Sequence, residues 1–271
     1  SGTLTAQTAV LASAAAGAGG AGEQVDEDLT QEATEARAVI YALLLSADEE
    51  ARGLQLEAIA REDAPEVSRK SAGLLDAVRT EMTDDVRRLQ EAERWFDAIR
   101  AMSPGGYRAF TGGVRMLIEQ DEVISLCEYA LQKSMTRSLD AAFGMRRGRP
   151  IRHRDLNLVT HETSLLLSRL AWAEAAPEDT ARAAFDAGAA QLNHQPKSDL
   201  ELLPSEACTL AAFDAALEEL AHATDMVRSN VLYACRAAVE MNEDYTHDQA
   251  LILIAVADAL DRDRPDWVFE E

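Results

Sequence analysis

The chain has 271 residues, of which 47% are hydrophobic and 27% are charged, and its formal net charge at pH 7 is −22. This length is enough for a sizeable core, in one large domain or in two of ordinary size. The acidic excess argues against nucleic acid or an anionic membrane surface as a partner, because both are polyanions. Abundant Ala, Leu and Glu and a lack of alternating β-branched runs favour an all-α fold.

Residues 1–22 are rich in alanine and glycine. Such small side chains are not apolar enough to span a membrane, and the positive flank of a signal peptide is missing. The segment is therefore predicted to be a flexible tether or a poorly specified helix, without direct membrane insertion.

Residues 23–145 are predicted to form a first helical lobe. Apolar residues recur at helical spacing throughout it, and the part from Ala38 to Leu45 is apolar nearly all round, which indicates a buried central helix. Start signals are an S-x-x-E pattern from Ser46 to Glu49 and a capping Thr83. The expected helices span residues 30–45, 46–61, 65–80, 83–99, 104–120 and 125–140.

The stretch from Ser103 to Asp140 is typical of two helices joined by a tight turn. Ser103 can accept a hydrogen bond from a backbone N–H of the first helical turn, and proline is tolerated at the first helical position that follows it. Ser125 and Glu128 have the spacing of a capping box, which begins the second helix. These two helices and their turn form a helix-turn-helix unit.

The same pattern returns 121 residues later without a gap. Thr246 and Gln249 form the matching capping box. The apolar positions also coincide, the pairs being Ile118/Val239, Leu131/Ile252, Met135/Val256 and Leu139/Leu260. Sequence identity is low, but caps and apolar positions agree together. The sequence therefore predicts a duplicated helix-turn-helix unit, one copy in each half.

A short basic run, residues 146–154, lies between the halves and is interrupted by glycine and proline, so it is predicted to be a linker. Its arginines are candidate interaction residues that either dock on the acidic surface of the other half, meet an acidic partner, or remain solvated. They are Arg146, Arg147, Arg149, Arg152 and Arg154.

Residues 155–271 are predicted to form the second lobe, with Trp267 of the tail packed against the body. Its expected helices span residues 155–173, 178–192, 206–220, 225–241 and 247–261. The whole chain is thus expected to be all-α, with about eleven helices in two related lobes and no sheet.

The residue types that carry catalysis or bind metals are scattered. His161 and Glu162 begin like a zincin motif, but Leu165 stands where the second histidine is needed. The three cysteines, Cys127, Cys208 and Cys235, lack metal-ligand spacing and are interpreted as buried thiols of a reducing compartment. No catalytic or cofactor-binding residues are assigned.

Two acidic turns could supply oxygen ligands to a hard cation, although the helix macrodipole favours acidic residues before a helix in any case. The candidate ligands are Asp121, Glu122, Glu243 and Asp244. They lack the alternating oxygens and the glycine of a calcium loop. Helix capping is the preferred interpretation.

Four long stretches resemble, in this order, the cytosolic C-terminal region that follows the protease domain in bacterial membrane zinc metalloproteases related to HtpX and to the CAAX prenyl endopeptidases. They are EARAVIYALLLSADEEARGLQL, MSPGGYRAFTGGVRMLIEQDEVISLCEYALQ, LLPSEACTLAAFDAALEELA and AAVEMNEDYTHDQALILIAVADALD. The two helix-turn-helix units are also similar to TerB-like helical modules. One departure is that both turns of that region usually read Ala-Asp-Gly, whereas this chain has Gln120-Asp121-Glu122 and Met241-Asn242-Glu243.

The resemblance implies a noncatalytic regulatory or protein-interaction domain, because the family's HExxH zinc site lies in an upstream domain that is absent from this chain. It implies no enzyme activity and no cofactor here, with zinc in the parent's protease domain. The partner would be another protein or that protease domain, at a cytoplasmic location tethered to the inner membrane through the upstream part. The alternative is a stand-alone TerB-like module for metal sensing or stress response.

Overall fold

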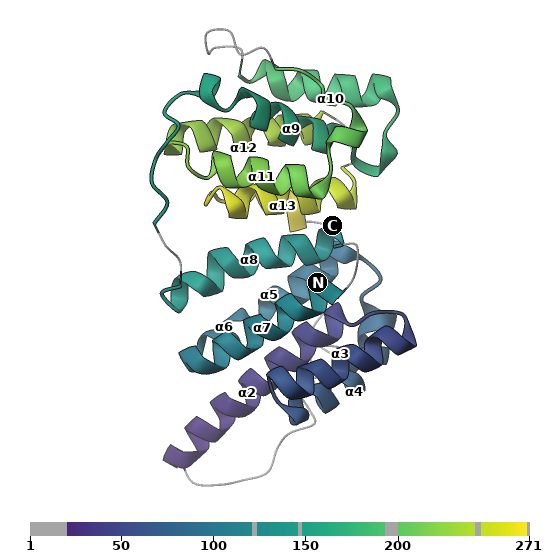
Figure 1. The fold of residues 1–271 in the computed structure, drawn as a ribbon, viewed down its shortest axis with the longest axis vertical. Helices are drawn as coiled ribbons and strands as arrows, with labels where there is room; N and C mark the ends of the chain where they lie inside the picture. The colour runs from purple at the N-terminus through teal and green to yellow at the C-terminus, as the bar shows by residue number, and fades with distance from the viewer. Residues whose placement is uncertain (1–20, 121–123, 146–147, 193–199, 242–244, 270–271) are drawn as a thin grey trace, which may run out of the picture.

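The computed structural model describes residues 21–120, 124–145, 148–192, 200–241 and 245–269 (Figure 1). Side chains are described from residue 31 on, except at positions 119, 120, 268 and 269. Within this part of the chain there are twelve α-helices and no strand. The prediction of an all-α fold with about eleven helices is confirmed.

The first lobe is built around α2, which contacts α4, α5, α6 and α7. Its residues from Ala38 to Leu44, together with Leu45, are at most 6% exposed. The predicted buried central helix is therefore present. The helices of this lobe are α2 (Ala21–Leu44), α3 (Glu49–Glu62), α4 (Pro65–Glu81), α5 (Asp85–Arg94), α6 (Phe96–Arg100), α7 (Pro104–Gln120) and α8 (Leu126–Ala142).

The second lobe has α9 at its centre, in contact with α10, α11 and α12. Its α-helices are α9 (Thr160–Ala171), α10 (Glu178–Ala190), α11 (Leu210–Leu220), α12 (Asp225–Glu240) and α13 (His247–Ala259). Short 3-10 turns stand before or between them, namely η1 (Leu156–Leu158), η2 (Ala173–Ala175), η3 (Ser205–Ala207) and η4 (Asp266–Phe269).

Two predicted helix starts are wrong by one or two residues. Asp48, not Ser46, caps α3, and Asp84, not Thr83, caps α5. In both cases an aspartate one or two residues after the predicted hydroxyl residue accepts a backbone N–H of the first turn at 2.8 Å. Aspartate is at least as good a cap as serine and better than threonine, so the nearer carboxylate takes the position.

Other boundaries differ because short turns replace regular helix. The predicted helix 83–99 is divided at Trp95 into α5 and α6, which explains the twelfth helix. The predicted helix 155–173 begins with the 3-10 turn η1 and becomes α-helical only at Thr160. The helix expected from residue 206 begins at Leu210, where Thr209 accepts the N–H of Ala212.

The two lobes share one hydrophobic core. Helix α13 lies between them, and α8 of the first lobe packs along it (Figure 1). Every residue of α13 from Gln249 to Ala259 is buried. A helix that is apolar on all sides needs cover on all sides, and α8 supplies the cover that α9, α11 and α12 do not.

The duplicated pattern coincides with matching caps and matching burial. Both capping boxes are present, with Ser125 and Thr246 each accepting the N–H of the third helical residue at 3.2 Å. All four predicted apolar pairs are buried. The correspondence also extends upstream. Buried residues of α5 and α6 have buried counterparts in α11 that lie 121 positions later in the chain. These pairs are Ala92/Phe213, Phe96/Leu217 and Ile99/Leu220.

Candidate functional site

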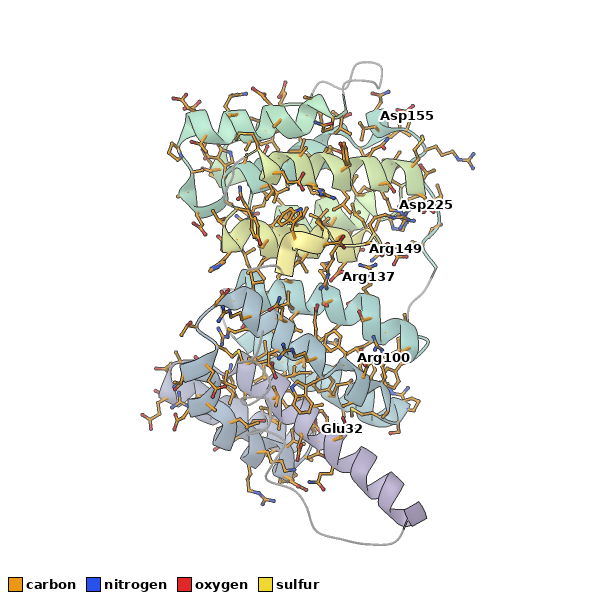
Figure 2. The ribbon with its side chains drawn as sticks, turned by 180° about the vertical axis from the view of Figure 1, so that it is seen from behind. Glu32, Arg100, Arg137, Arg149, Asp155 and Asp225 are labelled. Atoms are coloured by element: carbon orange, nitrogen blue, oxygen red, sulfur yellow. The ribbon has the colours of Figure 1, made fainter. Side chains whose placement is uncertain are left out.

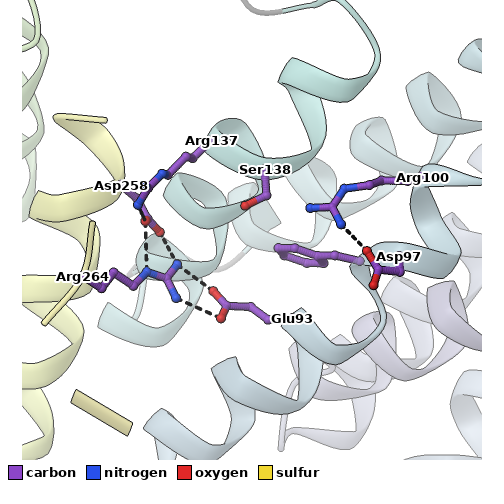
Figure 3. Close-up of a pocket in the computed structure, with 8 residues that line it drawn as sticks. Glu93, Asp97, Arg100, Arg137, Ser138, Asp258 and Arg264 are labelled. Atoms are coloured by element: carbon purple, nitrogen blue, oxygen red, sulfur yellow. Dashed lines mark hydrogen bonds and ion pairs between the residues drawn. The ribbon is translucent and has the colours of Figure 1, made fainter. Parts of the chain in front are cut away.

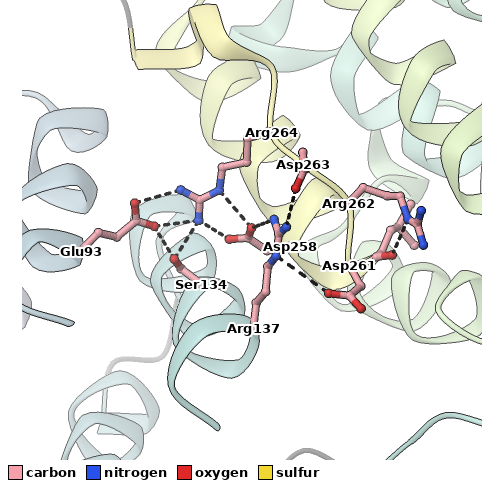
Figure 4. A network of polar contacts seen from close by, with 9 residues as sticks. Glu93, Ser134, Arg137, Asp258, Asp261, Arg262, Asp263 and Arg264 are labelled. Atoms are coloured by element: carbon pink, nitrogen blue, oxygen red, sulfur yellow. Dashed lines mark hydrogen bonds and ion pairs between the residues drawn. The ribbon is translucent and has the colours of Figure 1, made fainter. Parts of the chain in front are cut away.

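The most elaborate polar site lies where the lobes meet, and Arg264 is at its centre (Figure 4). The guanidinium donates to both carboxylate oxygens of Glu93 on α5, at 2.7 and 2.9 Å. It also donates to Ser134 Oγ on α8 at 2.8 Å and, through Nε, to Asp258 Oδ1 on α13 at 3.0 Å. One side chain after α13 thereby joins three helices of both lobes.

Asp258 is the buried counterpart of this arginine. Its side chain is 0% exposed, and it accepts from Arg264 and from Arg137 Nη1 of α8, the latter at 3.0 Å. Arg137 also meets Asp263, at 3.2 Å, and Asp261, at 3.9 Å. A buried carboxylate in the last turn of an apolar helix thus has a guanidinium from each lobe.

Electrostatics keep the Arg264 guanidinium protonated. Burial alone would lower the pKa of Arg264, but the hydrogen bonds and charges of Glu93 and Asp258 raise that pKa above its ordinary value. Desolvation largely offsets the attraction of such buried pairs, whereas removal of one partner leaves an uncompensated charge. The network therefore fixes the relative position of the lobes more than it adds stability.

The site has an approximate two-fold arrangement. Arg137 and Asp258, which bind each other, are 121 residues apart and so occupy equivalent positions of the repeat. Glu93 and Asp214 are equivalent in the same way, and each binds a cation of the other lobe. Asp214 on α11 accepts from Lys133 Nζ of α8 at 2.6 Å.

Asp214 also accepts from Tyr129 Oη at 2.8 Å, and the Lys133 ammonium lies 5.0 Å from the centre of that ring. Burial alone would raise the pKa of Asp214, but the hydrogen bonds from Lys133 and Tyr129 lower it below its ordinary value. The contact is therefore a charged pair at neutral pH. It forms the second polar contact between the lobes.

Two hollows flank Arg264. One, of about 280 Å³, is lined by residues of α5, α6 and α8 together with Asp258 and Arg264 (Figure 3). Arg100 and Asp97 form an ion pair at its edge. The other, of about 450 Å³, lies between α12 and residues 261–265 and is lined by Leu232, Tyr233 and others.

The predicted basic linker lies against the second lobe. Arg149 donates to the carbonyl oxygen of Ala259 at 2.9 Å and to Glu218 at 3.4 Å. Arg152 lies 3.9 Å from Glu219 of α11, with which His153 also pairs, and Arg154 is exposed. Figure 2 shows Arg149 close to Arg137, near the level where the lobes meet. The contacts of Arg149 and Arg152 are with α11 and α13, whereas Glu93 of α5 and Lys133 and Arg137 of α8 contact the other lobe.

The other predicted site residues are not brought together in the part of the chain that the structure describes. Asp121, Glu122, Glu243 and Asp244 lie outside it, as do Arg146 and Arg147. Within the described ranges no group of three or more His, Cys, Asp or Glu side chains is arranged to hold a metal ion. The same residues include no helix that is long and apolar enough to cross a bilayer.

The three cysteines are buried and unoxidised, as predicted. Burial raises the pKa of Cys127 and Cys235 to about 12, so these thiols stay protonated and are poor nucleophiles. Trp267 packs on Tyr245 with ring centres 4.5 Å apart and donates to Glu240 at 2.7 Å. The predicted docking of the tail is confirmed.

Sequence reasoning missed the residues of the junction site, namely Glu93, Ser134, Arg137, Asp258 and Arg264. One signal was available. Asp258 interrupts the apolar run LILIAVADAL, and its repeat-equivalent position holds an arginine, Arg137. Opposite charges at equivalent positions of a duplicated helix allow the two copies to form an ion pair where they meet about a two-fold axis.

Comparison with protein-family profiles, with curated proteins and with solved structures finds no match for this chain.

Proposed function

We propose that this chain is a noncatalytic, all-helical regulatory or protein-interaction domain of a membrane-anchored zinc metalloprotease whose HExxH domain lies upstream. The proposal rests on the resemblance of the four long stretches to the region that follows the protease domain in such enzymes. In this reading the chain binds a protein partner, or the protease domain itself, and helps to present substrates.

The observation that best supports an interaction role is the junction between the lobes. The two lobes are held in one orientation by their shared hydrophobic core and by the Arg137–Asp258 ion pair, and two hollows open beside that pair. A fixed orientation of two surfaces is what a docking platform needs, because preorganisation lowers the entropic cost of binding.

The first test of this proposal is the reading frame upstream of Ser1. We expect it to encode an HExxH motif and hydrophobic spans long enough for a membrane. The second is an assay of the purified chain, which we expect to leave casein intact with and without added zinc. Zinc-dependent cleavage by a preparation free of contaminants would contradict the proposal.

Calorimetric titration with calcium and zinc separates the proposal from a TerB-like metal-sensing module. We expect no binding at micromolar concentration, and Glu122→Gln is the matched variant. Micromolar binding by the native chain that is lost in Glu122→Gln would replace our proposal with the sensing function.

A further inference from the structure

We infer that the segment Arg262–Pro265 occupies a docking site for an extended, arginine-bearing peptide of a partner protein, and that Arg264 must leave before the partner binds. The inference deepens the proposed function and rests on it in one respect, namely that a protein partner exists. The chain's own segment shows which chemistry the site accepts.

The segment is bound like a peptide ligand. Residues 262–265 follow α13 and precede η4 without regular secondary structure, and they lie across the junction of the lobes (Figure 4). Pro265 favours an extended conformation of the residue before it, Arg264. An irregular segment whose arginine is anchored in a buried pocket presents that side chain as a binding hot spot does.

The pocket around Arg264 selects a guanidinium. Glu93 accepts two roughly parallel N–H groups, and Ser134 and Asp258 accept from the remaining edges. The Arg264 side chain is only 16% exposed in this position. A planar fork of donors satisfies these acceptors, whereas the single ammonium of a lysine does not.

The surroundings leave room for the residues on either side of a bound arginine. Arg264 lines both hollows, that of about 280 Å³ beside α5 and α6 and that of about 450 Å³ beside α12. The second hollow includes Tyr233, which is 59% exposed, and the half-buried Leu232. Exposed aromatic and apolar side chains next to a charged pocket suit the flanks of a peptide.

The native segment acts as a tethered competitor. It is anchored on both sides, by Arg262 to Asp225 at 2.8 Å and by Trp267 to Glu240 at 2.7 Å. A short tether gives an effective concentration on the order of millimolar, so a peptide in solution meets strong competition. The contact is therefore autoinhibitory, and loss of Arg264 from the pocket opens the site.

The test uses the full chain and a fluorescein-labelled peptide with the sequence LDRDRPDW, which is that of residues 260–267. Binding is measured by fluorescence anisotropy to the native chain, to Arg264→Ala and to Arg264→Ala combined with Glu93→Gln. We expect Arg264→Ala to bind the peptide at least about tenfold more tightly than the native chain, because the tethered guanidinium no longer fills the pocket. The added Glu93→Gln should abolish this gain.

A peptide with citrulline at the position of Arg264 is the chemical control, since it keeps the shape and loses the charge. Far-ultraviolet circular dichroism checks that each variant is folded, and Arg264→Lys, which keeps a cation without the fork, is the second variant if Arg264→Ala unfolds. Equal binding by native and variant chains, no binding by a folded variant, or equal binding of the citrulline peptide would each overturn the inference.

These outcomes are independent of the tests of the proposed function. If the peptide binds as expected but the upstream frame lacks HExxH, the docking site stands and the metalloprotease assignment fails. If HExxH is present but the folded variants do not bind the peptide, the docking site fails alone.

Discussion

At the scale of single residues, Tyr41 of α2 packs directly against the backbone of α7. The Tyr41 hydroxyl is 3.1 Å from Asp63 and 3.1 Å from the carbonyl oxygen of Phe110. Burial raises the pKa of Tyr41, and the charge of Asp63 raises it further, so the phenol stays protonated and donates. Gly113 provides the space, because a Cβ atom there would lie 2.3 Å from the phenolic oxygen.

Replacement of Gly113 by Ala should destabilise the protein by about 1–3 kcal/mol, the usual cost of overpacking. The tyrosine cannot shift without disturbing its contact with Asp63 or with Phe110. Gly112→Ala is the matched control, since nothing lies within 4 Å of its added Cβ, and it should stabilise α7 by about 0.5–1 kcal/mol. Urea denaturation measures the free energy of unfolding of both variants. Equal midpoints for the two variants would show that Tyr41 does not occupy this position.

At the scale of elements, the two capping boxes mark the starts of the helices that meet at the centre of the molecule. In α8 the Ser125 N–H donates to Glu128 at 2.8 Å, and in α13 the Thr246 N–H donates to Gln249 at 3.0 Å. Each box therefore satisfies two backbone donors that the helix itself cannot.

Ser125→Ala and Thr246→Ala should each lower the free energy of unfolding by about 1 kcal/mol, the typical value for loss of an N-cap oxygen. Thr136→Ala, at an exposed position of α8, is the control and should be neutral or slightly stabilising because alanine is the better helix former. Thermal and urea denaturation measure the change in the free energy of unfolding for each of the three variants. Unchanged midpoints in both cap variants, with the control behaving as stated, would contradict the assigned helix starts.

These elements also show what the sequence can and cannot predict. Apolar spacing and capping boxes are local, so the helices and the repeat are readable from the chain. The break at Trp95 is not, because its division into α5 and α6 accompanies packing of both pieces on α8 and α2. The site around Arg264 depends on residues up to 171 positions apart. Only the shared core brings them together.

At the scale of the whole molecule, α13 belongs to the core of both lobes. Its residues are buried from Gln249 to Ala259, and it pairs with α8 through the repeat-equivalent residues Arg137 and Asp258. The junction therefore resembles the interface of a two-fold dimer whose subunits are joined in one chain. Removal of the first lobe would expose one apolar side of α13 to water. The lobes are thus structurally distinct but depend on each other.

We therefore expect residues 148–271, produced alone, to self-associate at micromolar concentration, because the side of α13 that α8 covers would otherwise be exposed. Addition of residues 21–145 should convert the aggregate or dimer into a one-to-one complex, since α8 restores both the apolar cover and the guanidinium of Arg137 beside Asp258. Size-exclusion chromatography with light scattering measures the masses, and the full chain is the reference.

Arg137→Ala in the added half should weaken the complex, because Asp258 then has a guanidinium from its own half alone. A monomeric second half that melts cooperatively by itself would show instead that the cover from α8 is dispensable and that each lobe is an independent domain.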